Sequence, residues 1–435
     1  MIKLAEKLAI LGGPKAFPYV IEPGRWPPVT KQDEDYVLAS LHQKMHAWGP
    51  NCELLQQEWA RWNGNQFCLA TNSGTSALHM ALAACGTGPG DEVITTAVSW
   101  TSSMTCILHH NAIPVFVDVD WATMLLDPDA VEAAITPFTK DILPVHYWGL
   151  PCEMDRLMAI AAKHSLYVIE DGCQAHGSLY KGRKTGTIGH ASAFSLNQNK
   201  NLSGGEGGLF VTDDEVLLSG ARSLMSFGEM RSRYEERNFD SFPMGWMYRP
   251  SDLAAAYGRS ALSRLDETNA QTRANFVKLR SALEGTPGLV LPYDSPDQTS
   301  NGYAFAMRVD PAAAGDMPLS AFRDAVFNAI AAEGIPVGQH RWMLPSHAII
   351  QAKHAYGKGC PWSCPAVGRT VDYNLDQYPV SWQCVDSMIQ LSVDSHRPPA
   401  SEEELDALAY GIRKVFDQLD RSEEHTSELQ SPNTI

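Results

Sequence analysis

Short apolar runs recur along the first two thirds of the chain, and helical or polar stretches separate them. Runs of this length, bounded by glycine and polar residues, are typical of buried strands. Strands that alternate with helices predict a mostly parallel sheet with helices on both faces. The runs lie at residues 67–71, 92–97, 113–118, 142–147, 166–171, 191–196 and 208–212.

The pattern changes at about residue 270, where helices and strands no longer alternate regularly. Phe322, Val326 and Ile330 mark the apolar face of one helix. Ser401 followed by Glu404 is a capping-box pattern that opens the last helix. We therefore expect an α/β fold with a mostly parallel central sheet and a smaller α+β C-terminal domain.

The length of 435 residues is sufficient for one large and one small domain. The last 15 residues are polar, lack helical periodicity and resemble translated sequencing-adapter sequence, so we exclude them from the fold. The expected units are an N-terminal arm at 1–30, a large α/β domain at 31–268, a small α+β domain at 269–420 and a probable non-native tail at 421–435.

The charge and the cysteine content of the chain exclude some classes of partner and site. The net charge of −16 argues against nucleic acid and acidic membrane surfaces. The sequence has no run of about 18 apolar residues and no signal-peptide pattern, so we expect neither a membrane span nor export. Nine scattered cysteines fit a reducing cytoplasm. Cys360 and Cys364 form the one close pair, and without a second ligand pair we expect no metal site.

Two strand ends carry the residue types that a pyridoxal 5′-phosphate (PLP) enzyme needs. Asp171 ends the run at 166–171, where open α/β sheets bind ligands. Lys200 follows the run at 191–196 and precedes a glycine-rich turn. A lysine there can form a Schiff base, and a carboxylate against the ring nitrogen keeps the ring an electron sink. The alternatives are a solvated loop lysine and a helix N-cap at Asp171.

An anion site is expected after the run at 67–71. A turn at Gly74 leads into a helical stretch at 77–85, so free backbone N–H groups and the helix dipole point to one place. A P-loop pattern is absent. A simple N-cap explains the segment equally well. Hydroxyl donors are added by Ser73, Thr75 and Ser76.

Five stretches combine into one recognisable pattern. They read Ser-Gly-Thr-Ser-Ala-Leu at 73–78, Glu-Asp-Gly-Cys-Gln-Ala-His-Gly at 170–177, Phe-Ser and then Lys within 194–200, Gly-Glu-Gly-Gly at 205–208, and Tyr-Arg-Pro-Ser-Asp-Leu-Ala-Ala-Ala at 248–256. Together they resemble the sugar and cyclitol aminotransferases of the DegT/StrS family, which have the fold type I PLP architecture. The resemblance extends from about residue 8 to about residue 420.

The start of the chain is similar to one branch of that family. Residues 11–15 read Leu-Gly-Gly-Pro-Lys, as in enzymes that act on keto-cyclitols and related rings. Glutamine-dependent scyllo-inosose aminotransferases and aminohydroxybenzoate synthases belong to this branch.

The resemblance implies PLP as the cofactor and assigns residues to it. Lys200 would be the Schiff-base lysine and proton shuttle. Asp171 would bind the ring nitrogen, Trp100 would stack on the ring, and Gln174 would contact the phenolic oxygen. The remaining cofactor-binding residues would be Gly74, Thr75 and Ser195, which hold the phosphate, together with Ser76.

Substrate contacts are expected from four residues: His146, Arg231, Tyr248 and His340. His146 ends an apolar run on the ligand side of the sheet, with a packing role as the alternative. Arg231 lies in the charged segment 226–238, which is either a solvated loop or a lid whose arginines bind the carboxylate of the amino donor. His340 follows a strand-like stretch and would line the acceptor pocket.

One position departs from the family pattern. Family members carry an Asn within Gly-Tyr-Asn-Tyr-Arg that reaches the phosphate of the partner subunit, and this chain has Met247 there. Methionine cannot donate a hydrogen bond. The resemblance implies a homodimer with shared active sites, so another residue would have to replace this contact.

The implied function is transfer of an amino group from glutamine or glutamate to a keto-cyclitol or keto-sugar, in aminocyclitol, amino-sugar or antibiotic biosynthesis. One alternative is a PLP-binding regulator without transaminase activity, although this acidic chain has no spare basic DNA-binding segment. The other is a PLP- or pyridoxamine-phosphate-dependent sugar dehydratase. Relatives with that chemistry replace the lysine with histidine, whereas Lys200 is present.

Overall fold

The computed structural model describes residues 7–22, 24–229 and 239–419. Seven strands form a central sheet in the order β1-β9-β8-β5-β4-β2-β3. β9 runs antiparallel to both of its neighbours, and the other paired strands are parallel, as expected. The strands are β1 Phe67–Thr71, β2 Glu92–Thr96, β3 Ile113–Val117, β4 Thr139–Leu143, β5 Tyr167–Asp171, β8 Ala191–Ser195 and β9 Gly208–Thr212.

Six of these strands lie within one residue of the predicted bounds. The exception is β4, which ends at Leu143, although the apolar run was expected to extend to residue 147. The chain instead turns through the 3-10 helix η2, Tyr147–Gly149, in which Trp148 has a φ of 57°. This turn brings aromatic side chains to the carboxyl edge of the sheet.

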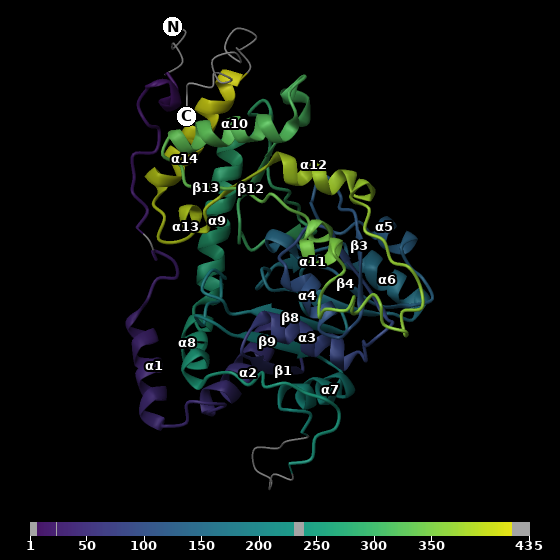
Figure 1. The fold of residues 1–435 in the computed structure, drawn as a ribbon. Coiled ribbons are helices and arrows are strands. Elements are labelled where there is room, and N and C mark those ends of the chain that lie inside the picture. The colour runs from purple at the N-terminus through teal and green to yellow at the C-terminus, as the bar shows by residue number, and fades with distance from the viewer. Residues whose placement is uncertain (1–6, 23, 230–238, 420–435) are drawn as a thin grey trace.

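Helices cover the sheet, so its strands are mostly buried. All residues of β2 and β9 are buried. Figure 1 shows α3 close to β8 and β9, with α4 next to them and α5 and α6 at the right of the view. The helices of this part are α1 Lys31–Gln43, α2 Pro50–Asn63, α3 Gly74–Ala84, α4 Ser102–Leu108, α5 Pro128–Ala133, α6 Met154–His164, α7 Glu215–Met225 and α8 Asp252–Leu262.

A second sheet is antiparallel, with the order β10-β12-β14-β13. The long helix α9, Leu265–Leu283, extends from α8 toward α10 and α14, which lie over this sheet (Figure 1). The expected capping box opens α14, since the Glu404 N–H donates to the Ser401 hydroxyl and the Ser401 N–H donates to the Glu404 carboxylate. The elements are β10 Leu289–Val290, β12 Ala306–Val309, β13 Val337–Gly338, β14 Met388–Leu391, α10 Leu319–Ala332 and α14 Glu402–Leu419.

Shorter elements complete the fold. A three-stranded sheet has the order β11-β6-β7, from Gln298–Thr299, Leu179–Tyr180 and Arg183–Lys184. The remaining helices are α11 Ala348–Gln351, α12 Pro379–Ser387 and α13 Val393–His396. Within the part of the chain that the structure describes, no helix combines the length and the apolar character needed to cross a bilayer.

The sheets enclose separate hydrophobic cores. Leu8 and Phe17 of the N-terminal segment pack into the core of the second sheet, with residues of α9, α10 and α14. Met343, Trp362 and Met388 pack into the core of the large sheet, although they follow the predicted boundary at residue 268. The division into a large and a small domain stays a prediction. Residues between 343 and 388 belong to the predicted small domain but pack against the large sheet.

Candidate active site

A cavity of about 560 Å³ lies where the carboxyl ends of the large sheet meet the second sheet. Its volume is in the usual range for small-molecule sites. The large sheet contributes residues that follow β1, β2, β5 and β8, and the second sheet contributes residues next to β13 and on β14. Eight of the predicted residues line this one cavity: Gly74, Thr75, Trp100, Asp171, Gln174, Ser195, Lys200 and His340.

The amino end of α3 forms one wall. Ser73 caps this helix, and its hydroxyl accepts the N–H of Ser76. A Cβ atom on Gly74 would lie 2.8 Å from both Cys173 Sγ and Ser195 Cβ, so only glycine lets the helix approach Ser195 this closely. Backbone N–H groups at a helix start form an anion site. The wall therefore suits a phosphate.

Ser76 differs from the expectation for cofactor-binding residues. It does not line the cavity, and its hydroxyl donates a 2.6 Å hydrogen bond to Asn72 Oδ1. The reason is its place on the helix, where it points back to the turn before α3. The predicted role of Ser76 as a direct ligand has no support from this geometry.

Asp171 ends β5 with its side chain 3% exposed. Ser103 Oγ donates to Oδ2 at 2.7 Å, and the backbone N–H of Cys173 donates to Oδ1 at 3.2 Å. A turn follows Asp171 rather than a helix, so it is not a helix N-cap. Among the described residues no arginine or lysine pairs with this carboxylate. A buried carboxylate without a cation suits the protonated nitrogen of a bound ring.

Lys200 lines the same cavity and is held in place by two hydrogen bonds. Its backbone N–H donates to the Asn197 carbonyl, and its Nζ donates to the hydroxyl of Tyr303 at 3.1 Å. The same Nζ lies 4.8 Å from the centroid of the Tyr303 ring. The side chain is half-buried and lines the cavity. It is therefore not a freely solvated loop lysine.

Gln174 and Trp100 complete the surroundings expected for a planar ring. Gln174 Oε1 accepts the backbone N–H of Trp148 at 2.8 Å, which leaves its NH₂ group as the donor available to a ligand. Trp100 lines the cavity, and 63% of its surface is exposed. Such high exposure is unusual for tryptophan, which is mostly buried in folded proteins. A flat ligand over this indole would cover it.

His340 faces the cavity from the segment after β13. Its Nδ1 lies 3.2 Å from the hydroxyl of Tyr147, and its ring is 4.8 Å from that of Trp342. Burial lowers the pKa of His340 to about 4, so the ring is neutral near pH 7. Nε2 has no partner among the described residues. The neutral ring adds a polar surface to the wall of the cavity.

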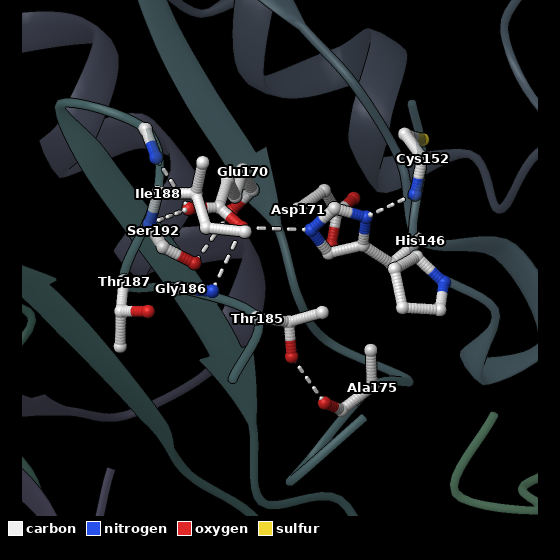
Figure 2. Close-up of polar contacts among 12 residues, drawn as sticks. His146, Cys152, Glu170, Asp171, Ala175, Thr185, Gly186, Thr187, Ile188 and Ser192 are labelled. Carbon is white, nitrogen blue, oxygen red and sulfur yellow. Dashed lines mark hydrogen bonds and ion pairs between the residues drawn. The ribbon is translucent and has the colours of Figure 1, made fainter. Parts of the chain in front are cut away.

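His146 does not reach the cavity, contrary to the expected substrate contact. It is fully buried, and Figure 2 shows it between Glu170 and Cys152. Nε2 lies 2.9 Å from Glu170 Oε2, while Nδ1 accepts the Cys152 N–H at 3.1 Å. The packing alternative describes this geometry, because β4 ends early and turns His146 inward.

Glu170 links this histidine to the loop that follows β7. Its carboxylate accepts the N–H groups of Gly186, Ile188 and Gly189 (Figure 2). Burial raises the pKa of this carboxyl, but the hydrogen bonds from His146 and the loop outweigh burial and hold the pKa below its usual value. The network fixes the end of β5 and with it the neighbouring Asp171.

One further expected substrate residue, Tyr248, is not brought to the cavity. The Tyr248 hydroxyl lies 2.8 Å from His79 Nδ1, and Tyr248 is not among the residues that line the cavity. Arg231 lies outside the described residues. Met247, at the departure from the family pattern, is 48% exposed.

Sequence patterns did not point to three residues that the structure places at or behind the site. Tyr303 lines the cavity, Ser103 holds Asp171, and Arg397 contacts the Lys200 segment. None belongs to a local motif, because each reaches the site from an element distant in sequence. Within the described ranges no cluster of three or more His, Cys, Asp and Glu side chains could hold a metal ion.

Taken together, the cavity fits PLP. It offers a helix start for the phosphate, a buried carboxylate for the ring nitrogen, an exposed indole for the ring face, and a lysine amine for covalent attachment. Gly74 has no room for a side chain where the phosphate would lie.

Comparison with known proteins supports this assignment. Residues 27–370 match the model of the DegT/DnrJ/EryC1/StrS aminotransferase family. The spore coat polysaccharide biosynthesis protein SpsC of Bacillus subtilis (strain 168) is 37% identical over 295 residues, which cover 66% of this chain and 76% of that protein.

Solved structures share the fold. The crystal structure of 3-amino-5-hydroxybenzoic acid synthase superimposes with a TM-score of 0.80 and 27% identity, over 92% of this chain and 99% of that one. A Streptococcus pneumoniae protein described as a sugar aminotransferase, in its PLP form, gives a TM-score of 0.79 at 23% identity, over 92% and 100% of the two chains. At that identity the second likeness shows the fold alone.

Proposed function

Because the chain belongs to the DegT/DnrJ/EryC1/StrS aminotransferase family, we propose that it transfers an amino group from glutamine or glutamate to a six-membered keto-sugar or keto-cyclitol. The protein is a PLP-dependent aminotransferase with the fold type I architecture. The identities of the donor and the acceptor are the proposal.

One observation carries the proposal: Lys200, Asp171 and the start of α3 line a single cavity although they follow three different strands. When bound, PLP supplies an electron sink for the bonds of the amino-bearing carbon. The Asp171 carboxylate keeps a proton on the ring nitrogen. The Lys200 amine would hold the cofactor covalently, and its free Nζ would move a proton at the substrate carbon.

The polar lining supports a hydroxyl-rich acceptor ring. Asn197, Asn199, Gln339, His340 and Gln390 offer neutral donors and acceptors. A site built from such groups rejects analogues that lack a matching hydroxyl, because its buried polar atoms would be left unpaired. Proteins named for spore coat polysaccharide biosynthesis and for synthesis of an amino-hydroxy ring acid are similar to this chain, which supports a ring acceptor.

The proposal includes a homodimer, in which residues near 226–250 lie at the site of the partner subunit. Exposed apolar side chains in this region support burial against a second copy. They are Phe239, Phe242, Met244 and Met247, with exposed fractions of 69%, 85%, 74% and 48%. Nine cysteines without disulfides support a reducing compartment such as the cytoplasm.

The subunit count tests the dimer directly. Light scattering at dilute concentration should give twice the chain mass, and an active monomer would contradict the shared site. Met247→Asn should tighten PLP modestly if no other residue has replaced the family's asparagine. An unchanged PLP affinity in a confirmed dimer would show that another residue already holds the partner's phosphate.

The catalytic proposal is tested in two half-reactions. The protein with PLP is first converted by glutamine or glutamate, and the aminated enzyme is then mixed with keto-cyclitols, keto-sugars, pyruvate or oxaloacetate. We expect a ring ketone to restore the original absorbance fastest. If pyruvate or oxaloacetate is faster than every ring ketone, the acceptor class is wrong. Release of a dehydrated sugar without an amine would favour a dehydratase.

A further inference from the structure

Tyr303 contacts the reactive atom of the site. Its hydroxyl lies 3.1 Å from Lys200 Nζ, and the ring is 7% exposed and lines the cavity. Trp148 stacks beside it, with ring planes 21° apart. Asn301 Oδ1 accepts the Tyr303 N–H at 3.0 Å. The ring is therefore fixed on one side of Nζ before any ligand binds.

Arg397 holds this tyrosine and the lysine segment together from behind. It is completely buried. One guanidinium nitrogen donates to the Tyr303 carbonyl at 2.6 Å and another donates to the Asn199 carbonyl at 2.7 Å. Asn199 directly precedes Lys200, and the guanidinium carbon is 4.7 Å from the centroid of the Tyr303 ring. A single side chain thus sets the spacing between Lys200 and Tyr303.

This cation is costly to bury. None of the ion pairs within residues 7–22, 24–229 and 239–419 gives Arg397 a carboxylate, and its Nε has no hydrogen-bond partner there. Burial lowers its pKa to about 10. The ring faces of Trp26 and Tyr303, at 4.9 Å and 4.7 Å from the guanidinium carbon, compensate only part of the cost of burying this charge. Its two donated hydrogen bonds both end at the Lys200–Tyr303 pair.

We propose that Tyr303 is a further catalytic residue that aims Lys200 Nζ during proton transfer, and that Arg397 is its positioning residue. A phenol accepts a hydrogen bond from an ammonium group and donates one to a neutral amine. Tyr303 therefore holds Nζ in both protonation states. With PLP bound, Nζ would take the proton from the substrate carbon and deliver it to the cofactor carbon on the other side of the imine nitrogen, while the phenol keeps its own proton. The proposal rests on the aminotransferase function.

The test replaces the hydroxyl and keeps the ring. Tyr303→Phe is compared with Tyr373→Phe, a buried control whose hydroxyl donates to the Pro114 carbonyl and accepts from Trp362, away from the cavity. Each full-length variant is loaded with PLP, and exchange of the glutamate Cα hydrogen in D₂O is followed by NMR. PLP affinity and borohydride trapping are measured in parallel.

We expect Tyr303→Phe to bind and trap PLP like the wild type but to exchange the Cα hydrogen ~10²-fold more slowly, the lower range for general acid–base catalysis. Its apparent affinity for glutamate should change little, so the loss is in the rate constant. Tyr373→Phe should exchange at the wild-type rate. Exchange by Tyr303→Phe within twofold of the wild type would overturn the proposal.

Arg397→Lys and Arg397→Met test the positioning role. Both variants lose the two hydrogen bonds to the Tyr303 and Asn199 carbonyls, so both should lower the rate of Cα hydrogen exchange while borohydride trapping of PLP persists. The exchange rate of Arg397→Lys should be no higher than that of Arg397→Met. If neither variant folds, Tyr303→Phe decides alone. Hydrogen exchange needs no acceptor, so a wild type that exchanges but aminates no ring ketone contradicts only the proposed acceptor. A wild type that neither traps PLP nor exchanges contradicts both.

Discussion

The hydroxyl of Ser103 donates a 2.7 Å hydrogen bond to Oδ2 of Asp171. Ser103 lies in the first turn of α4, and its oxygen is 2.9 Å from the hydroxyl of Ser99. The Cys173 N–H holds the other carboxylate oxygen. The carboxylate is thereby oriented in the folded protein, and a ring nitrogen that binds there meets a fixed charge at no cost in reorganisation.

Asp171→Asn should lower the rate of the donor half-reaction by ~10²-fold or more, since roughly 3 kcal/mol of transition-state stabilisation is lost. The amide keeps the size of the side chain, so much of the PLP binding should remain. Stopped-flow absorbance with glutamate measures the rate. Ser103→Ala, which leaves the charge but loosens it, should have a smaller effect. A near-normal rate for Asp171→Asn would leave Asp171 a purely structural role.

Gly74→Ala should weaken PLP binding by ~10-fold or more. The added methyl would lie 2.8 Å from Cys173 Sγ and Ser195 Cβ, so the start of α3 must move away from the phosphate position. Gly88→Ala is a matched control, because a Cβ there meets nothing within 4 Å. PLP titration gives the affinities, and thermal melting shows whether folding is intact. Equal PLP affinities for the two variants would contradict the phosphate site.

His340→Ala should reduce kcat/KM for the acceptor half-reaction by ~10-fold or more and leave the donor half-reaction nearly unchanged. The side chain lines the cavity and is distant in sequence from Lys200 and Asp171. The same preparation supplies both rates, so the donor rate is the internal control. A donor rate that falls as far as the acceptor rate would remove His340 from the acceptor pocket.

Asp141 makes stability depend on pH. It is fully buried, and burial raises the pKa of its carboxyl to about 7, although Thr87 donates a hydrogen bond to it. The folded state therefore keeps a proton on Asp141 up to about pH 7, whereas the unfolded state releases it near pH 4. The contribution of Asp141 to the free energy of unfolding is therefore fully present below about pH 4 and is lost as the pH rises through about 7.

Asp141→Asn should remove this loss and raise the free energy of unfolding at pH 8 by ~1–3 kcal/mol relative to the wild type. Urea unfolding at pH 5 and pH 8 measures the difference. Asp376→Asn, at an exposed position, should leave both values unchanged. A variant that loses as much stability as the wild type between the two pH values would show that Asp141 is ionised in the folded protein.

The sequence pattern predicted the strands because a strand is recognisable from the residues within it. β2, β5 and β8 are buried almost throughout, and each includes an adjacent pair of apolar residues, such as Val93 and Ile94 in β2. The strand order was not predictable, since β9 pairs not only with β8, its neighbour in sequence, but also with β1, which lies more than a hundred residues earlier. Tyr303 and Arg397 could not be predicted as site residues for the same reason, because they reach Lys200 from segments distant in the sequence.

The motifs predicted the cofactor residues better than the substrate residues. Gly74, Asp171 and Lys200 follow strands directly, so the topology brings them together. His146 also follows a strand, but the early end of β4 turns it toward Glu170, and no periodicity reports where a strand ends within a continuous apolar run. Tyr248 is held by His79. Their side-chain directions depend on packing rather than on position.

The central claim is that Lys200 carries PLP. The most direct measurement is borohydride reduction of the PLP-loaded protein, followed by digestion and mass spectrometry of the peptides. The account predicts a pyridoxyl adduct on the peptide that contains Lys200, and no trapped cofactor or turnover in Lys200→Ala. An adduct on a different lysine, or a Lys200→Ala variant that still traps PLP and transaminates, would contradict it.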